Sequence, residues 1–432
     1  MSKILIKDGY VITMDGPPIE GGHVLIEDDR IAYVGPEEQK ADQVIRAKGC
    51  VVMPGLVNAH THAAMTLFRG YADDMPLQQW LEEHIWPVEA HLTDNDVYTG
   101  TMLACLEMIR SGTTAFADMY FHMDYAARAV EESGIRASLS YGMIELFDEA
   151  KARTELQEGG RFVRQWNNAS DGRITTMYGP HAPNTCSKGF LSKVKEQAVE
   201  DNARIHIHVL ETEAELNQMK DQYGMCSVNM LDEIGFLGPD VLAAHCIWLS
   251  AGDMDIMADK GVNAVHCPVS NMKLASGIAP VPELLSRGVN VALGTDGCAS
   301  NNSLDMFGEM KTAALLHKVN AMDPTAMPAG EVLKMGTSNG AKALGIPAGI
   351  LRQGMAADII IVDMHTPGLI PVHEPVSQLI YAARGTDVKT TIVNGQVLME
   401  DGIVLSIDQE KVIEQASSAA RRLADKSKVK VK

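Results

Sequence analysis

Short apolar segments alternate with helical patterns through the middle of the chain, and this alternation restricts the fold more than any other feature. Strands that alternate with helices form parallel sheets, and eight such units close into a (β/α)₈ barrel. We therefore predict an α/β fold with a TIM-like barrel. The expected strands span 51–58, 113–119, 136–142, 174–180, 204–210, 241–245, 263–267 and 289–295, and the expected helical segments include 98–110, 125–133, 187–201, 213–223 and 282–287.

The two ends of the chain have a different character, with apolar and polar residues that alternate as in short β-strands. Polar turns separate the segments 3–14 and 23–35, and segment 390–399 contains Asn394-Gly395, a dipeptide typical of tight hairpins. We therefore expect one small composite β-sandwich formed by the N- and C-terminal segments. The expected division is 1–57 for its N-terminal part, 58–355 for the barrel, and 356–432 for its C-terminal part with a terminal helix and tail.

Ionisable residues follow the expected barrel strands at their carboxyl ends, where barrel enzymes place their active sites. In His60-Thr61-His62 the two histidines are two residues apart, so in an extended strand both point to the same side. Such a pair alone is a weak signal, because short motifs match by chance. The other strand ends strengthen it, since they carry Asp118, His181, His208, His245, His266 and Asp296. His206, two residues before His208, is interpreted as a buried neighbour and not as a ligand.

Four of these residues, His60, His62, His208 and Asp296, match the ligand set of a catalytic metal site that keeps one position for water. The end of the fourth expected strand, 177–181, has no lysine that could bridge two metals. We therefore expect one divalent ion per subunit. Zn²⁺ is the first choice, and Fe²⁺ or another divalent ion is the alternative, because imidazole and carboxylate ligands suit all of them. Such an ion lowers the pKa of bound water to about 7 and so supplies hydroxide as a nucleophile.

A single-metal site also needs a group that moves protons. Glu211 follows His208 by three residues and is the candidate general acid and base. The segment 211–215 also reads as an ordinary acidic helix start, and both interpretations can hold. We expect His245 to hold or polarise the attacking water, and Asp296 to accept a hydrogen bond from it as well as to bind the metal. The expected catalytic residues are thus Glu211, His245 and Asp296, and Glu211 and Asp296 would also contact the substrate.

Charge and hydropathy limit the classes of partner. The chain has 37 Lys and Arg against 56 Asp and Glu, a net charge of −19, which disfavours nucleic acid and anionic membrane surfaces. No apolar run approaches the roughly 20 residues of a membrane span, and the first residues lack a secretory signal pattern. We therefore expect a cytoplasmic protein that acts on a small molecule and associates into a homo-oligomer.

Several motifs resemble those of the amidohydrolase superfamily, and the resemblance covers nearly the whole chain. They are Pro54-Gly-Leu-Val-Asn-Ala-His60-Thr-His62, His208-Val-Leu-Glu211, Ala244-His245 and Gly294-Thr-Asp296-Gly. The more specific resemblance is to the adenosine-type deaminases that act on S-adenosylhomocysteine, 5'-methylthioadenosine and 5'-deoxyadenosine. Its motifs are Gly70-Tyr-Ala-Asp-Asp-Met-Pro-Leu-Gln-Gln-Trp80-Leu, Ile85-Trp-Pro-Val-Glu89, Gly179-Pro-His181-Ala-Pro, Ser270-Asn-Met-Lys-Leu-Ala-Ser-Gly-Ile-Ala-Pro280 and Thr295-Asp296-Gly-Cys-Ala-Ser-Asn-Asn302.

The resemblance implies a hydrolytic deaminase that converts 5'-modified adenosines to the inosine analogues plus ammonia. Glu89 would accept hydrogen bonds from both ribose hydroxyls. Its position alone favours a surface helix acid, but its place in the Trp86-Pro-Val-Glu89 motif reverses that preference. His181 would contact N3 of the purine ring. Glu211 would transfer a proton to N1 while hydroxide attacks C6.

The amino-acid part of S-adenosylhomocysteine is matched less well. Relatives that favour this substrate look as though they use arginines near the third strand for its carboxylate, whereas this chain has Tyr141 at the outer end of that strand. Arg161 is the candidate substitute, because arginine suits carboxylates, and a solvated helix residue is its alternative interpretation. We therefore expect a preference for 5'-deoxyadenosine or 5'-methylthioadenosine, with S-adenosylhomocysteine as an alternative.

Two other readings of the site stay open. A guanine deaminase or a triazine-type chlorohydrolase would use the same metal and acid–base pair, but a free base would not need Glu89 for ribose. A non-catalytic barrel protein is the third possibility, since fold does not fix function. It is disfavoured because such a protein would be expected to lose ligands or the acid–base residue, and all are present.

Overall fold

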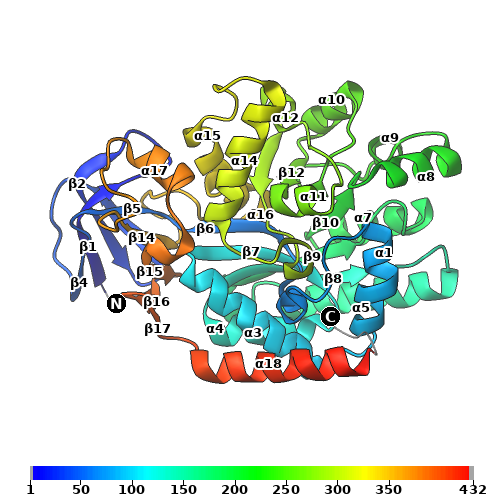
Figure 1. Ribbon diagram of the computed structural model, residues 1–432, viewed down its shortest axis with the longest axis horizontal. Coiled ribbons are helices and arrows are strands. Elements are labelled where there is room, and N and C mark those ends of the chain that lie inside the picture. Colours follow the sequence, from blue (N-terminus) through cyan, green and yellow to red (C-terminus); the bar gives the residue numbers. More distant parts are fainter. Residues whose placement is uncertain (1–2, 428–432) are drawn as a thin grey trace.

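A sheet of eight parallel strands forms the centre of the molecule, and its strands follow one another in sequence order. The structure is a computed structural model that describes residues 3–427 (Figure 1). The strands are β6 (Leu56–Thr61), β7 (Thr113–Tyr120), β8 (Arg136–Met143), β9 (Ile174–Pro180), β10 (Arg204–Val209), β11 (Val241–His245), β12 (Asn263–His266) and β13 (Asn290–Leu293). This confirms the predicted barrel.

The first and last strands meet at the carboxyl end of the barrel. The amide of Asp296, just after β13, donates to the carbonyl oxygen of His60 in β6, with an N···O distance of 3.0 Å. Gly294 allows this approach, because a Cβ at that position would lie 2.8 Å from the backbone nitrogen of His60. Closure of the barrel thus brings two predicted ligands, 236 positions apart in the sequence (296 − 60), into direct contact.

Apolar side chains fill the inside of the barrel, and helices cover the outside. The buried interior residues include Val57, Ala115, Met177, Leu242, Val265 and Ala292. The longer covering helices are α3 (Asp94–Arg110), α4 (Met123–Ser133), α5 (Glu149–Trp166), α7 (Lys188–Glu200), α8 (Glu213–Tyr223), α10 (Ala251–Lys260) and α14 (Met306–Ala321). Shorter ones are α9 (Ser227–Glu233), α12 (Val281–Ser286), α15 (Ala329–Met335) and α16 (Ser338–Leu344). The predicted helical segments are therefore confirmed, with shifts of a few residues at their ends.

Short helical turns follow several barrel strands and build the carboxyl-end loops. After β6 come η1 (Ala63–Phe68), α1 (Leu77–Trp80), the π-helical η2 (Leu81–Ile85) and α2 (Trp86–Glu89). α11 (Pro268–Lys273) follows β12 and α13 (Cys298–Asn301) follows β13. The short helices elsewhere are α6 (Ala169–Gly172), just before β9, and α17 (Pro375–Tyr381) and η3 (Gly385–Asp387), between the later strands of the chain.

Both ends of the chain build a second, mixed sheet beside the barrel (Figure 1). Its nine strands follow the path β17-β16-β15-β14-β5-β1-β2-β3, with β4 paired to β1. They are β1 (Lys3–Val11), β2 (Ile19–Glu27), β3 (Arg30–Gly35), β4 (Gln43–Arg46), β5 (Cys50–Pro54), β14 (Ile359–Asp363), β15 (Val388–Val393), β16 (Gln396–Glu400) and β17 (Ile403–Val404). The pairing of β5 with β14 joins the two ends, as predicted, and Asn394 and Gly395 form the hairpin turn with φ of 51° and 75°.

The single strand expected over 51–58 is wrong, because two strands occupy this segment. Residues up to Pro54 belong to β5 of the mixed sheet, and β6 of the barrel begins at Leu56. Between them, a Cβ at Gly55 would lie 2.0 Å from Oγ1 of Thr114, so the chain passes closely over the start of β7. Both strands are buried, so the apolar pattern continues across the change of sheet and conceals it.

Two sets of contacts attach the C-terminal segment to the barrel. The guanidinium of Arg136 in β8 donates to both carboxylate oxygens of Asp358 at 2.7 and 3.1 Å, and to Asn394 at 3.0 Å. The expected terminal helix is α18 (Gln409–Lys426), which runs along α3 (Figure 1), with Arg422 bonded to Asp96. Residues 428–432 of the expected tail lie outside the described residues. Within 3–427, no helix has both the length and the apolar character that crossing a membrane requires.

Candidate active site

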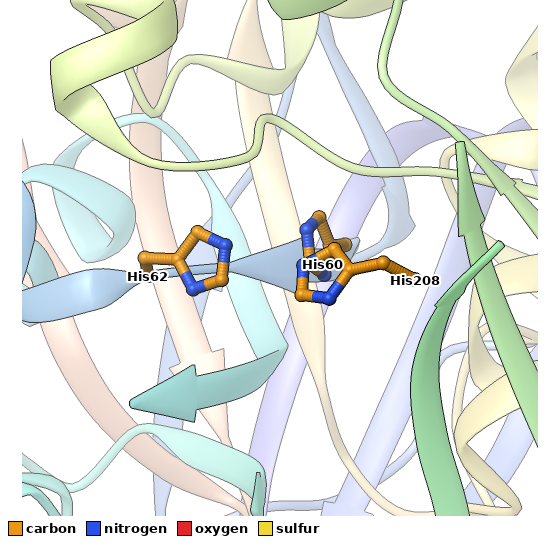
Figure 2. A group of neighbouring side chains, drawn as sticks. All are labelled: His60, His62 and His208. Atoms are coloured by element: carbon orange, nitrogen blue, oxygen red, sulfur yellow. The ribbon is translucent and has the colours of Figure 1, made fainter. Parts of the chain in front are cut away.

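Imidazole rings from β6 and β10 converge at the carboxyl end of the barrel. Figure 2 shows His60, His62 and His208 with their rings turned toward one another. The ring centre of His60 lies 4.9 Å from that of His62 and 4.9 Å from that of His208. The ligand atoms of these three residues lie within 4.8 Å of one another, and so do those of His60, His245 and Asp296. The five residues therefore surround one small space.

Hydrogen bonds on the outer ring nitrogens orient the histidines. Nδ1 of His62 donates to the carbonyl oxygen of Met119 at 2.6 Å, and Nδ1 of His208 donates to that of His181 at 2.7 Å. Nδ1 of His60 lies 2.8 Å from Nε2 of His206. Because Nδ1 carries the hydrogen bond in each ring, Nε2 is the nitrogen left to face the shared space. Metal-binding histidines have this arrangement, in which an outer partner fixes the tautomer.

The carboxylate of Asp296 is held on the other side of the same space. Its Oδ1 lies 3.4 Å from Nε2 of His60 and 3.2 Å from Nε2 of His62. Its Oδ2 accepts hydrogen bonds from the hydroxyls of Ser270 at 2.7 Å and Ser300 at 3.0 Å. Two serines on separate loops thus fix one oxygen and leave the other directed at the histidines.

The histidine rings differ in their preferred protonation state, because burial and the charge of Asp296 act on them in opposite directions. Burial lowers the pKa of His60 to about 4, against the opposing effect of Asp296. Burial also disfavours protonation of His62, but the hydrogen bond and charge of Asp296 outweigh it and raise the pKa of His62 to about 9. Burial opposes ionisation of Asp296 too, yet its contacts with His60 and His62 keep its pKa well below the usual range.

The donor set fits a divalent cation. Nε2 of His60 is fully buried and forms no hydrogen bond, which is costly for a polar atom unless a ligand occupies the space before it. Three imidazole nitrogens and a carboxylate oxygen are the ligand types that Zn²⁺ and similar ions take in catalytic sites. The residues His60, His62, His208 and Asp296 would hold the ion.

Glu211 and His245 lie beside this cluster. Oε2 of Glu211 is 3.8 Å from Nε2 of His245, whose Nδ1 donates to Oδ1 of Asn271 at 3.0 Å. Burial raises the pKa of Glu211, the charge of His245 opposes that rise, and the charge of Asp296 adds to it. A carboxyl whose pKa is raised in this way accepts a proton more readily than an exposed one, as a general acid and base requires.

The structure also brings Glu89 and His181 to the cluster. Glu89, at the end of α2, accepts a hydrogen bond from the hydroxyl of Tyr120 at 2.6 Å, and the ring of Tyr120 lies 6.3 Å from that of His62. Burial raises the pKa of Glu89 to about 7. The ring of His181 lies 4.9 Å from that of His208, and burial lowers the pKa of His181 to about 4.

Arg161 has a different environment. It lies in α5, where its guanidinium donates to both oxygens of Asp124 at 3.2 and 2.7 Å and to Glu158 at 2.9 Å. Asp124 belongs to α4, so this ion pair joins two helices of the outer layer. In the described part of the chain, these contacts connect Arg161 to neighbouring helices and not to the histidine cluster.

Sequence reasoning missed most of the residues that support the site. Asp118 follows the predicted strand-end pattern, but its role is to accept hydrogen bonds from Thr61 at 3.0 Å and from the amide of Ala63 at 2.7 Å. His266 shares the pattern too, yet its Nε2 faces that of buried His317 at 3.2 Å. Ser270 and Ser300 lie inside motifs that the resemblance identified, but serine alone gives no signal of its partner.

Known proteins resemble this chain along nearly its whole length. Residues 51–398 match the sequence profile of the amidohydrolase family. The 5'-deoxyadenosine deaminase of Methanosarcina mazei is 64% identical, over 98% of this chain and 99% of that protein. The 5-methylthioadenosine/S-adenosylhomocysteine deaminase of Pelotomaculum thermopropionicum is 52% identical, over 99% of this chain and 100% of that protein.

Solved structures agree with the fold. An adenosine deaminase from Xanthomonas campestris with bound zinc superposes with a TM-score of 0.94 at 35% identity, over 98% of this chain and 99% of that chain. The atrazine chlorohydrolase of Arthrobacter aurescens, complexed with zinc, has a TM-score of 0.91 at 24% identity, over 96% of this chain and 100% of that chain, a likeness of fold alone. The predicted barrel with its composite terminal module is confirmed, and the chain belongs to the amidohydrolase family.

Proposed function

We propose that this protein is a metal-dependent deaminase that converts 5'-modified adenosines to the inosine analogues and ammonia, with 5'-deoxyadenosine and 5'-methylthioadenosine as its preferred substrates. The observation that carries the proposal is the 64% identity, over nearly the full length of both chains, to a protein named 5'-deoxyadenosine deaminase. The grouping of His60, His62, His208 and Asp296 around one space supports it.

One divalent ion per subunit, with Zn²⁺ as first choice, would bind to these four residues. When bound, such an ion lowers the pKa of water to about 7. The zinc reported in the Xanthomonas campestris relative supports the choice of metal. Asp296, kept ionised by its neighbours, would supply the negative charge of the site.

The proton transfers fall to Glu211. Water adds to C6 of the purine, and Glu211 takes a proton from that water and passes it to N1. The proton of the new C6 hydroxyl then moves to the amino group, the C6–N bond breaks, and ammonia leaves while the oxygen stays on C6 as a carbonyl. His245, fixed by Asn271, would hold the incoming oxygen in position. The raised pKa of Glu211 suits a group that must be deprotonated first and protonated next.

Glu89 and His181 would bind the nucleoside. Glu89 keeps acceptor capacity beyond its bond to Tyr120 and would receive the ribose hydroxyls. His181 would meet the purine ring from beside His208. A partly buried carboxylate at this place is a reason to expect nucleosides and not free bases, because a site that leaves such a group unpaired binds poorly.

The decisive experiment is an ammonia-release assay with purified protein whose metal content has been measured. The substrates are 5'-deoxyadenosine, 5'-methylthioadenosine, S-adenosylhomocysteine and adenosine, with adenine, guanine and a chlorotriazine as the competing classes. We expect the highest kcat/KM for the first two compounds. A preference for a free base or for the chlorotriazine would refute the proposal. The expected homo-oligomer stays a prediction, which sedimentation equilibrium would test.

The role of Arg161 is a separate part of the same assay. If Arg161 binds the amino-acid carboxylate, Arg161→Ala should raise KM for S-adenosylhomocysteine and leave 5'-deoxyadenosine unchanged. Arg164→Ala is the matched control, since Arg164 lies one turn away in α5 and pairs with Asp201. Equal effects of Arg161→Ala on both substrates would assign Arg161 to helix packing through Asp124.

A further inference from the structure

We propose that Glu215, a residue outside the expected catalytic set, is a positioning residue that fixes the backbone of Glu211. The inference rests on the proposed function, in which Glu211 moves protons. Glu215 lies in the first turn of α8 and is 5% exposed. A carboxylate buried to this extent requires partners of its own.

The two carboxylate oxygens of Glu215 accept hydrogen bonds from the backbone amides of two consecutive residues. Oε1 accepts a hydrogen bond from the amide of Leu210 at 2.9 Å, and Oε2 accepts one from the amide of Glu211 at 3.0 Å. Oε1 also accepts from the hydroxyl of Ser227 at 2.9 Å. The carboxylate therefore holds the segment that carries the proton-transfer residue, and Ser227 holds the carboxylate.

The hydrogen bonds that Glu215 accepts differ from those of ordinary helix capping. In a capping box, the acidic side chain returns to the amide of the N-cap residue itself. The helix α10 has this arrangement, since Asp253 accepts from the amide of Ser250 at 2.8 Å. In α8 the N-cap is Thr212, and Glu215 reaches past it to the two preceding residues. Its contacts thus serve the strand-end turn and not the helix end.

That turn is one that the local sequence disfavours. Leu210 has a φ of +52°, a left-handed conformation that side chains with a Cβ rarely adopt. Its carbonyl oxygen accepts from the amides of Ile247 and Trp248 at 3.1 and 3.2 Å, just after His245. Glu215 fixes the amide side of Leu210 while the segment after β11 fixes its carbonyl side. The Cα of Glu211, and with it the direction of its side chain toward His245, is set by these contacts.

The test is Glu215→Gln, which keeps the size of the side chain but must present an NH₂ group to one of the two amides. Metal content and KM for 5'-deoxyadenosine should change little, because Glu215 bonds to the backbone of Leu210 and Glu211 and to Ser227, and to no expected metal ligand. We expect kcat to fall about 10–100-fold, since small misplacements of a catalytic group cost rates of this order. The pH at which kcat rises should also move, which mere loosening of a helix would not cause.

Glu213→Gln is the matched control, because Glu213 is an exposed acid in the same first turn, and it should behave as the unmodified protein. Glu211→Gln distinguishes a failure of the positioning role of Glu215 from a failure of the proposed proton-transfer role of Glu211. If Glu211→Gln is inactive while Glu215→Gln keeps normal kcat and pH dependence, the positioning role is wrong and the proposed function stands. If Glu211→Gln deaminates normally, the proton-transfer role itself fails.

Ser227→Ala covers the case in which Glu215→Gln does not fold. This variant removes only the hydroxyl that bonds to Oε1 and leaves both backbone amide partners of Glu215 in place. We expect a smaller, few-fold loss of kcat with the same direction of change in the pH profile. Unchanged kcat and an unchanged profile in Ser227→Ala would then overturn the proposal.

Discussion

Left-handed backbone occurs in both sheets of this protein, but it falls on different kinds of residue. In the mixed terminal sheet and its turns, the positions with positive φ include Asp8, Asp28, Asn394, Gly395 and Asp401. These residue types adopt the left-handed region readily and mark turns in sequences. At the carboxyl ends of the barrel strands, the positions are Leu210, His245, Cys246 and Asp296. The side chains of Leu210 and Cys246 disfavour that conformation, whereas Asp296 belongs to the residue types that adopt it readily.

The difference shows which forces hold each region. In the terminal sheet, the aspartate, asparagine and glycine residues of the turns themselves favour the backbone that they adopt, and Met14, between β1 and β2, is an exception. At the barrel mouth, backbone hydrogen bonds to distant segments hold it, as the bond from the amide of Cys246 to Val209 and the bond from the amide of Asp296 to His60 do. Backbone strain of this kind persists only where surrounding contacts determine it, and it collects at functional sites. Changes at the mouth should therefore affect activity, and changes in the terminal sheet should affect stability alone.

The largest effect expected from this comparison is on turnover in Glu211→Gln. The variant keeps the shape of the side chain and all metal ligands, so metal content should stay at one ion per subunit. Loss of the acid–base group should reduce kcat by about 10²–10⁴-fold. Ammonia release under saturating 5'-deoxyadenosine, with metal analysis of the same sample, measures both. Normal turnover would remove Glu211 from the mechanism.

The second effect concerns metal affinity and the support of Asp296. The double variant Ser270→Ala, Ser300→Ala removes both hydroxyls from Oδ2 and leaves every expected ligand in place. Loss of such outer partners typically weakens metal binding about 10–100-fold. Competition with a chelator gives the affinity directly. Ser286→Ala serves as the control, since its hydroxyl donates to the carbonyl oxygen of Glu283 within the same helix, α12. Unchanged affinity would mean that the ligands alone determine the site.

The third effect belongs to the terminal sheet and should leave the site intact. Gly395 has a φ of +75°, and a Cβ there would lie 1.8 Å from the carbonyl oxygen of Asp28. Gly395→Ala should therefore reduce the free energy of unfolding, by about 1–3 kcal/mol, as measured by denaturant titration. Its kcat/KM should equal that of the unmodified protein. A loss of activity without loss of stability would contradict the division between the two regions.

The sequence predicted the parts of the fold and site that depend on local pattern. Alternation of strands and helices gave the barrel, the Asn394-Gly395 turn gave the hairpin, and i, i+2 spacing placed His60 and His62 on one side. The change from one sheet to the other at Gly55 could not be predicted from local pattern. It accompanies the close approach of Thr114, which lies 59 positions further along the chain (114 − 55).

The residues that support the site could not be predicted from the sequence, for the same physical reason. His206 was interpreted correctly as a buried neighbour, but its bond to Nδ1 of His60 joins strands far apart in the sequence. Glu215 looks like a helix-start acid until its two amide partners are seen. Local residue preferences cannot reveal such partners, because the contacts exist only once the barrel has closed.

The smallest expected effect is a shift in pH dependence at the contact between Tyr120 and Glu89. Burial raises the pKa of Glu89 to about 7, while the hydrogen bond from Tyr120 favours the ionised form and limits that rise. If the carboxylate binds ribose, KM should increase as pH falls through about 7, because protonation removes an acceptor.

Tyr120→Phe removes the donor, so the pKa of Glu89 should rise further and the increase in KM should begin at higher pH. The two proteins should converge at pH values where Glu89 is ionised in both. Glu89→Gln should have a high KM that no longer depends on pH in this range, which identifies the titrating group. If the pH dependence of KM persists in Glu89→Gln, another group is responsible. In that case Tyr120 on β7 would not determine the protonation of Glu89 on α2. The influence of distant contacts at the barrel mouth would then be limited to the metal cluster and the turn that contains Glu211.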